Sequence, residues 1–392
     1  MLEIIKRNGL PDTGAASSLA SCPGKPFFLQ RNYLRQYWSM AKLPEEKFEL
    51  TAAFAEKIQN NLPLRQLSWH LYRYLTLNPM SNIEIGKLTD NIDVLGVDTG
   101  MLYLLTAMSL IPGFIARAHR EGFPEKYGKA GAERIGSTTV FYAQEYNGAF
   151  GLRSKSLLFL LHYNQTATWR IGRFDFVVHK TTDTIPEIYC KDDEVIAFCA
   201  DGIMLDENGE QVDIPEKSVR IAKIQTDGTQ VTGIPIDFDH GLALNKQVTI
   251  DLKSGWEKVA GANDWTLFFH IPGGGGMTPK LCESSFKEAL EFFKEYMPER
   301  NFRIIWSASW IFNPRWKEEL PDSNLAKLIT RGRLYPAVAG VNPGLYFVFG
   351  KTEGDPEQFT ANNRLEKVVL QCYREKSLRR VGWFIRTSEI TG

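Results

Sequence analysis

A glycine-rich segment, residues 273–276, lies between an apolar run at 264–271 and a segment that favours a helix. The apolar run is typical of a central strand covered on both faces, while Thr278 and Pro279 suit the N-cap and the first position of a helix. Backbone N–H groups in such a loop can close on phosphate oxygens, aided by the positive end of the helix. The predicted anion-binding residues are Gly273, Gly274, Gly275, Gly276, Thr278 and Lys280, the last being the nearest cation.

The pattern of these glycines also limits the kind of nucleotide that the loop could bind. It is neither a GxGxxG at the start of a Rossmann unit nor a GxxxxGK[ST] loop, so dinucleotides and nucleoside triphosphates are not favoured. A glycine-rich turn without any ligand explains the same residues, because glycine also serves permissive turn geometry. The residues alone leave both interpretations open.

Three side chains outside the loop could take part in proton transfer. His270 ends the predicted strand, where a near-neutral imidazole could accept a proton from an attacking amine, although a core histidine bonded to the backbone fits equally well. Ser307, on the next predicted strand at 302–311, could donate to a thiolate leaving group. Tyr335 could act as a general acid, but the sequence does not distinguish it from the other tyrosines.

Cys282 offers a different chemistry. It falls in the first turn of the predicted helix, where the helix dipole lowers the pKa of a thiol, but also on the apolar face of that helix with Phe286. Buried thiols usually act as small hydrophobes. A hydrolase using Cys282 with His270 would need a third group to orient the base, and none is spaced for it. We therefore expect Cys282 to belong to the core.

Helical periodicity dominates from residue 31 to about 150, with helices expected at 32–42, 44–59, 64–77 and 133–146. The uncharged stretch 99–116 reaches the lower edge of membrane-spanning length. Pro112 and Gly113 are expected to split it into two ordinary buried helices. The sequence therefore predicts a helical N-terminal domain and no membrane partner.

From residue 156 the hydrophobic period changes to that of strands. Strands are expected at 157–163, 167–179, 194–199 and 211–214, with a hairpin turn at 207–210. The interval 183–216 holds eleven acidic residues and one lysine, and is interpreted as a solvated hairpin insert. The strand, helix and strand over 264–311 form a βαβ connection, which predicts parallel pairing. A strand at 345–350, a helix at 363–375 and a strand at 380–386 complete the pattern.

Composition excludes several classes of protein. The chain has 392 residues, of which 43% are hydrophobic, as in globular proteins. Its 46 basic residues balance 46 acidic ones, so the protein has no net positive charge that would attract nucleic acid. Residues 364–386 carry seven basic and two acidic side chains, a local excess that suits a small polyphosphate better than nucleic acid. Five scattered cysteines without a CxxC pair, and a start that lacks an apolar signal region, indicate the cytoplasm.

A possible metal site at Asp237, Asp239 and His240 lacks the ligand spacing of a calcium loop or a zinc motif. Two carboxylates and an imidazole within four residues are more typical of a turn. No metal is expected.

Several long segments are similar to one known family. They are TWRIGRFDFVVH, VTGIPIDFDHGLALNKQVTIDLKSGW, FFHIPGGGGMTPKLCESSFKEALEFF, IIWSASWIFNP and LPDSNLAKLITRGRLYP. In this order they resemble the bacterial acyltransferase-domain family with a helical N-terminal N-acyltransferase domain and a GNAT-like C-terminal domain. The resemblance implies an α+β fold, with the helical domain at 1–150 and a GNAT-like mixed sheet flanked by helices at 151–392.

The resemblance also implies a ligand and an activity. In such folds acyl-coenzyme A lies beside a splayed central strand, here 264–271, and its pyrophosphate is held by the following loop, here 273–278. The usual loop has an Arg or Gln ahead of spaced glycines, whereas this one offers backbone amides only, so no arginine is expected there. The implied function is an acyl-coenzyme A dependent N-acyltransferase with an amine as acceptor and His270, or a water that it orients, as base. The alternative is a noncatalytic GNAT-like module that binds a ligand or a protein.

Overall fold

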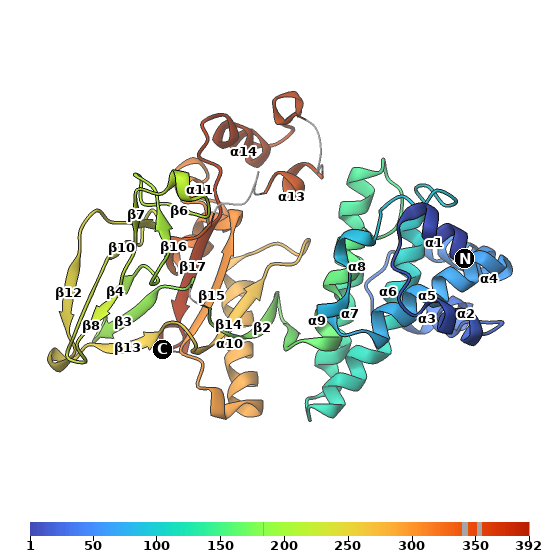
Figure 1. Cartoon of the computed structure of the whole chain (residues 1–392), viewed down its shortest axis with the longest axis horizontal. Coiled ribbons are helices and arrows are strands. Elements are labelled where there is room, and N and C mark those ends of the chain that lie inside the picture. Colours follow the sequence, from blue (N-terminus) through green and yellow to red (C-terminus); the bar gives the residue numbers. More distant parts are fainter. Residues whose placement is uncertain (183, 339–343, 351–354, 392) are drawn as a thin grey trace. The chain divides into compact units, whose positions relative to one another are not determined.

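A computed structural model describes the whole chain except residues 183, 339–343, 351–354 and 392. The chain forms two compact units (Figure 1). The first comprises Met1–Ile171 with Pro272–Gly274, and the second Gly172–Ile271 with Gly275–Gly392.

The first unit is helical. Its helices are α1 (Leu2–Asn8), α2 (Ala15–Ser21), α3 (Arg31–Trp38), α4 (Phe48–Asn60), α5 (Leu62–Leu77), α6 (Thr99–Arg120), α7 (Glu125–Glu145), α8 (Ser154–Phe159) and α9 (Leu161–Gln165), followed by strand β1 (Thr168–Ile171). The helices expected at 32–42, 44–59, 64–77 and 133–146 are confirmed as α3, α4, α5 and part of α7. Each buries one apolar stripe, as Leu34 and Trp38 of α3 show.

The predicted break at Pro112 is wrong, because α6 runs without interruption from Thr99 to Arg120. Proline removes the hydrogen bond that residue 112 would donate to the carbonyl of Met108, four residues earlier. The Tyr33 hydroxyl donates to that carbonyl oxygen instead, at 2.9 Å. α6 is long and apolar enough to cross a membrane, but 78% of its most apolar window is buried inside the protein, as in a core helix.

The strand predicted at 157–163 is also wrong, since these residues lie in α8 and α9. The run is apolar at nearly every position, and Leu157, Leu160 and Leu161 are fully buried. A short, continuously apolar run does not distinguish a buried strand from a buried helix. The helical region therefore continues to Gln165.

The second unit is built on a central sheet. Its strands are β2 (Phe174–Lys180), β14 (Trp265–His270), β15 (Ile304–Ser309), β17 (Val381–Arg386) and β16 (Arg333–Pro336), in the spatial order β2-β14-β15-β17-β16 (Figure 1). β14 and β15 pair in parallel, which confirms the predicted βαβ connection, and the other neighbours are antiparallel. With the helices of the first unit, this mixed sheet confirms the expected α+β fold.

Helices α10 (Pro279–Tyr296) and α12 (Asn324–Thr330) cover one face of this sheet. Phe286 of α10 stacks on Phe174 and on Trp383, and the indole of Trp383 donates to the Ile329 carbonyl of α12. The opposite face packs Ile304 and other apolar side chains against the small sheets of the insert. The sheet is therefore covered on both faces, as its continuously apolar strands require.

The segment between β2 and β14 folds into small antiparallel sheets. Their strands are β3 (Glu187–Lys191), β4 (Glu194–Phe198), β5 (Met204–Leu205), β6 (Gln211–Val212), β7 (Arg220–Ile221), β8 (Gln225–Thr226), β9 (Gln230–Gly233), β10 (Ile236–Asp237), β11 (Leu242–Ala243), β12 (Val248–Asp251) and β13 (Glu257–Ala260). The predicted hairpin at 207–210 is confirmed, because β5 pairs with β6 across a turn in which Asp206 accepts from the amides of Asn208 and Glu210.

The C-terminal part differs from the sequence pattern at one element. Helix α14 (Arg364–Arg374), capped by Asn363, and strand β17 are confirmed. The strand predicted at 345–350 is instead helix α13 (Leu345–Phe349), bounded by Gly344 and Gly350 at φ 91° and 68°. Five apolar residues between two glycines are too few for periodicity to decide. The remaining helices are α11 (Arg315–Glu319) and α15 (Ser388–Thr391).

Candidate functional site

The predicted strand, glycine loop and helix are present. β14 ends at His270, α10 begins at Pro279, and the Leu281 N–H donates to the Thr278 hydroxyl oxygen at 3.4 Å, which confirms the N-cap. Three consecutive glycines, Gly274, Gly275 and Gly276, have φ of 74°, 72° and 64°. Side chains rarely adopt this left-handed region, so the loop requires glycine there. Such turns can gather backbone N–H groups into an anion-binding concavity.

The prediction that no arginine serves this loop is wrong. Arg173, in the turn before β2, donates an Nε hydrogen bond to the carbonyl oxygen of Gly276. Its Nε also lies 3.9 Å from the position that a Cβ would take on Gly275. Arg173 is only 9% exposed. The two partners are 103 residues apart in the chain, so no local sequence signal could connect them.

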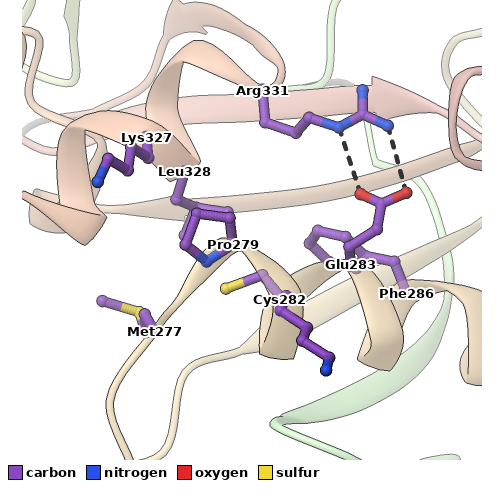
Figure 2. Close-up of a pocket in the computed structure, with 9 residues that line it drawn as sticks. Met277, Pro279, Cys282, Glu283, Phe286, Lys327, Leu328 and Arg331 are labelled. Carbon is purple, nitrogen blue, oxygen red and sulfur yellow. Dashed lines mark hydrogen bonds and ion pairs between the residues drawn. The ribbon is translucent and has the colours of Figure 1, made fainter.

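A cavity of about 310 Å³ lies between the first turns of α10 and helix α12 (Figure 2). Its walls combine apolar and basic side chains: Met277, Pro279, Lys280, Cys282, Glu283, Phe286, Lys327, Leu328 and Arg331. The single acid, Glu283, pairs with Arg331 at 3.3 Å, as the dashed lines in Figure 2 show. The cavity therefore presents a net positive charge beside an apolar surface, a combination that suits an anionic ligand with an aromatic or aliphatic part.

Sequence reasoning identified Lys280 but missed Lys327 and Arg331. Both basic residues lie at the C-terminal end of the α12 segment, four positions apart, so they project on the same side. The N-cap Ser323, which accepts from the amide of Ala326 at 3.1 Å, marks the start of that helix in the sequence. That spacing was the available signal, but only the fold brings α12 against α10.

The two parallel strands separate toward their carboxyl ends. β14 is in register with β2 at six positions, from Trp265 to His270, whereas its register with β15 covers only Leu267 with Ile305 and Phe268 with Trp306. β14 and β15 therefore diverge just before the glycine loop. A splayed central strand at this place is what the resemblance implied.

His270 and Ser307 lie on opposite faces of the sheet. His270 is directly opposite Asp175 and shares its face with Phe268, whose ring meets the imidazole edge to face at 4.7 Å. Phe268 pairs with Trp306, so Ser307, the next residue of β15, points to the other face. The structure therefore does not bring these two candidates together. His270 lies at the end of β14, beyond the point where the strands diverge.

Tyr335 is remote from both. It belongs to β16, opposite Gly382 of β17, and is 2% exposed. Two strands lie between β16 and β14, which corresponds to a distance of about 14 Å at the usual strand spacing. Burial raises the pKa of the Tyr335 hydroxyl well above its ordinary value. The three predicted catalytic side chains therefore do not form one constellation.

Cys282 behaves as the core residue that the sequence predicts. It is 4% exposed, and burial raises the pKa of its thiol to about 11, against the opposing influence of the Arg173 charge. α10 covers the face of the sheet that carries Phe269, whereas His270, the next residue, points to the other face. The two side chains therefore lie on opposite faces of the sheet, and this geometry does not support a hydrolase in which His270 activates Cys282.

The remaining candidates form structural contacts. His240 Nδ1 lies 2.7 Å from Asp237 Oδ2, and the Asp239 amide donates to the same carboxylate at 2.9 Å, as in a closed turn. Within the described part of the chain, no three His, Cys, Asp or Glu side chains are placed to hold a metal. In the basic stretch 364–386, Arg374 pairs with Glu357 at 2.8 Å and Arg386 with Glu389 at 3.1 Å.

A mixed sheet with a diverging parallel pair, followed by a loop and a helix N-terminus, defines the class of GNAT-like folds. The sequence profile of the GNAT-like C-terminal domain family matches residues 168–382, more than half of the chain. The protein belongs to this family.

Solved structures share the whole architecture. An acyltransferase mutant in complex with octanoyl-CoA matches with a TM-score of 0.63 and 16% sequence identity, over 98% of each chain. An acyltransferase in complex with decanoyl-CoA and teicoplanin matches with the same TM-score, identity and coverage. At this identity the likeness establishes the fold. No curated protein matches the sequence.

Proposed function

We propose that the protein is an acyl-coenzyme A dependent N-acyltransferase that modifies a small-molecule amine. The observation that carries the proposal is the continuity of three features. The diverging strands β14 and β15 lead into the left-handed glycine loop, and the loop leads into the basic cavity at the start of α10. A thioester chain, a pyrophosphate and a phosphorylated nucleoside follow one another in the same order along an acyl-coenzyme A molecule.

Each part of the donor has a matching environment. The amides of residues 274–278 and the N-terminus of α10 suit the pyrophosphate. Lys280 and Lys327 supply positive charge for the nucleoside phosphate, and Leu328 supplies apolar contact for the base. Two of the structures with this fold hold octanoyl-CoA and decanoyl-CoA, which supports the same class of donor here.

The proposed reaction is direct attack of an amine on the thioester carbonyl. A carbon–nitrogen bond forms, the carbon–sulfur bond breaks, the amine proton passes to a base, and coenzyme A leaves as the thiolate or thiol. We assign the base to His270, acting directly or through a water, because of its place beyond the divergence of the strands. Ser307 and Tyr335 receive no step. Ser307 lies on the other face of the sheet, and two strands separate Tyr335 from β14.

The acceptor is the less defined substrate. One structure of this fold contains teicoplanin together with decanoyl-CoA, which favours a small molecule over a protein as acceptor. The five cysteines, all free thiols, fit a reducing compartment, so we place the reaction in the cytoplasm.

A noncatalytic binding module is the second candidate, favoured by the separation of the predicted catalytic side chains. Calorimetry with coenzyme A, followed by an assay of thiol release from acetyl- and decanoyl-coenzyme A over a panel of amines, separates the two. Binding with amine-dependent thiol release supports the enzyme. Binding without release over the whole panel supports the module. Absence of binding at millimolar coenzyme A contradicts the enzyme and leaves the module, which would then bind another ligand or a protein.

A further inference from the structure

We propose that Arg173 is a positioning residue that holds the glycine loop in the shape that receives the donor's pyrophosphate. The inference rests on the proposed function and adds to it a residue from outside the loop. It explains how a glycine loop whose own sequence contains no arginine could bind a diphosphate.

The turn that carries Arg173 is fixed against α10. Gly172 has a φ of 55°, and a Cβ at this position would lie 3.1 Å from the Cβ of Ser285. The Phe174 amide donates to the Ser285 hydroxyl at 3.3 Å. The backbone on both sides of Arg173 thus rests on the helix that follows the glycine loop, and this support fixes where its side chain begins.

A loop of consecutive glycines is entropically costly to hold in one conformation. Glycine loses more backbone freedom on ordering than any other residue, so three consecutive glycines are costly to fix. The Arg173 hydrogen bond to the Gly276 carbonyl fixes one peptide plane. Because a trans peptide points its N–H opposite to its C=O, the Met277 N–H is directed to the side away from Arg173. Met277 is also a wall residue of the basic cavity.

Arg173 also places a positive charge beside the loop. Its guanidinium is largely buried, so solvent and salt screen it less than a surface charge. The charge reaches the first turn of α10, since it lowers the pKa of the Cys282 thiol against the effect of burial. A rigid planar guanidinium, unlike the flexible ammonium of lysine, loses little freedom when it makes such a bond.

The test compares Arg173→Met and Arg173→Lys with a control, Arg300→Met, which removes a guanidinium that stacks on Trp265 at 4.4 Å. Hydrogen exchange without ligand measures the order of residues 274–278. Titrations with coenzyme A and with pantetheine, which lacks the diphosphate, measure recognition. For Arg173→Met we expect faster loop exchange, about tenfold weaker coenzyme A binding and unchanged pantetheine binding, because one charge-assisted hydrogen bond is lost. KM for the acyl donor should rise at unchanged kcat, and Arg300→Met should match the wild type.

Wild-type exchange and coenzyme A affinity in Arg173→Met would overturn the proposal. An equal loss for coenzyme A and pantetheine would also overturn it, because the residue would then support the fold in general. If the wild-type protein binds no coenzyme A, the proposed function fails, and the exchange measurement still decides whether Arg173 orders the loop.

Discussion

At the scale of residues, the structure places far apart the side chains that the sequence analysis selects as catalytic candidates. His270, Ser307 and Tyr335 each have a suitable functional group, but strand alternation and strand order place them apart. Arg173 shows the converse, because an arginine far away in the chain completes a loop in which the sequence shows no cation. Residue type and local spacing predict caps and strand faces, whereas long-range partners depend on how the strands assemble.

Gly275→Val should weaken coenzyme A binding strongly. A β-branched residue is strained at a φ of 72°, and the side chain would enter the space beside Arg173. Gly228→Val is the matched control, since Gly228 has a φ of 86° in an open turn. Denaturant titration should show a comparable loss of stability in both variants, and calorimetry a loss of coenzyme A affinity in Gly275→Val alone. Equal coenzyme A affinity in the two variants would show that the loop is not part of the donor-binding site.

His270→Ala should lower kcat by about a hundredfold with little change in coenzyme A affinity, because a general base acts only when the amine loses its proton. Ser307→Ala is the control and should keep the wild-type rate, as the Ser307 side chain lies on the other face of the sheet. Steady-state kinetics of thiol release with an active amine measure both. A normal kcat in His270→Ala would assign the proton transfer to another group.

At the scale of elements, the parts with local signals were predictable. The continuous apolar run of β14, the Thr278 cap and the apolar stripe of α10 each specify their own structure, and together they give the βαβ unit. The short apolar runs in α8, α9 and α13 carry no period that decides between helix and strand. The continuous α6 could not be predicted because the group that replaces the missing bond of Pro112 belongs to Tyr33, in another helix.

Thr278→Ala should lower the free energy of unfolding by about 1 kcal/mol through the loss of the α10 cap. Ser284→Ala, an exposed change on the same helix, should have little effect. Chemical denaturation of both variants is the measurement. Equal stability of Thr278→Ala and the wild type would mean that the hydroxyl does not cap the helix in solution.

Tyr33→Phe should destabilise the protein by about 1 kcal/mol, because the Met108 carbonyl above Pro112 loses its donor. In a Pro112→Ala background α6 regains a backbone donor for that carbonyl, so the same Tyr33→Phe change should then cost less. A double-mutant cycle by denaturant unfolding gives the coupling. Additive effects would show that the hydroxyl and the proline act independently.

At the scale of the whole molecule, buried titratable groups should confine stability to a window of pH. Burial lowers the pKa of His70, His162 and His179 below 6.5. These histidines stay neutral in the folded state while the unfolded chain binds protons, so stability is complete above pH 6.5 and falls as the pH drops through that value.

The buried thiols limit the stability of the folded state at alkaline pH. Burial raises the pKa of Cys199 to about 12 and that of Cys282 to about 11, from 9.0. Because the unfolded chain releases these protons more readily, stability should fall as the pH rises through 9. Midpoints of thermal unfolding between pH 5 and 10 should therefore show a maximum near neutrality. Cys199→Ala and Cys282→Ala together should flatten the alkaline side, and an unchanged slope there would contradict the assignment.

The divergence of β14 and β15 gives a central strand the character of a sheet edge at its last two residues, Phe269 and His270. Edge strands present backbone groups that accept a further chain, and the pantetheine arm of coenzyme A is an extended chain with amides of its own. The donor would then join the sheet as an inserted strand between β14 and β15. On the proposed function, product release would therefore amount to the loss of a strand from the centre of the domain, and the domain should be least stable just after each turnover.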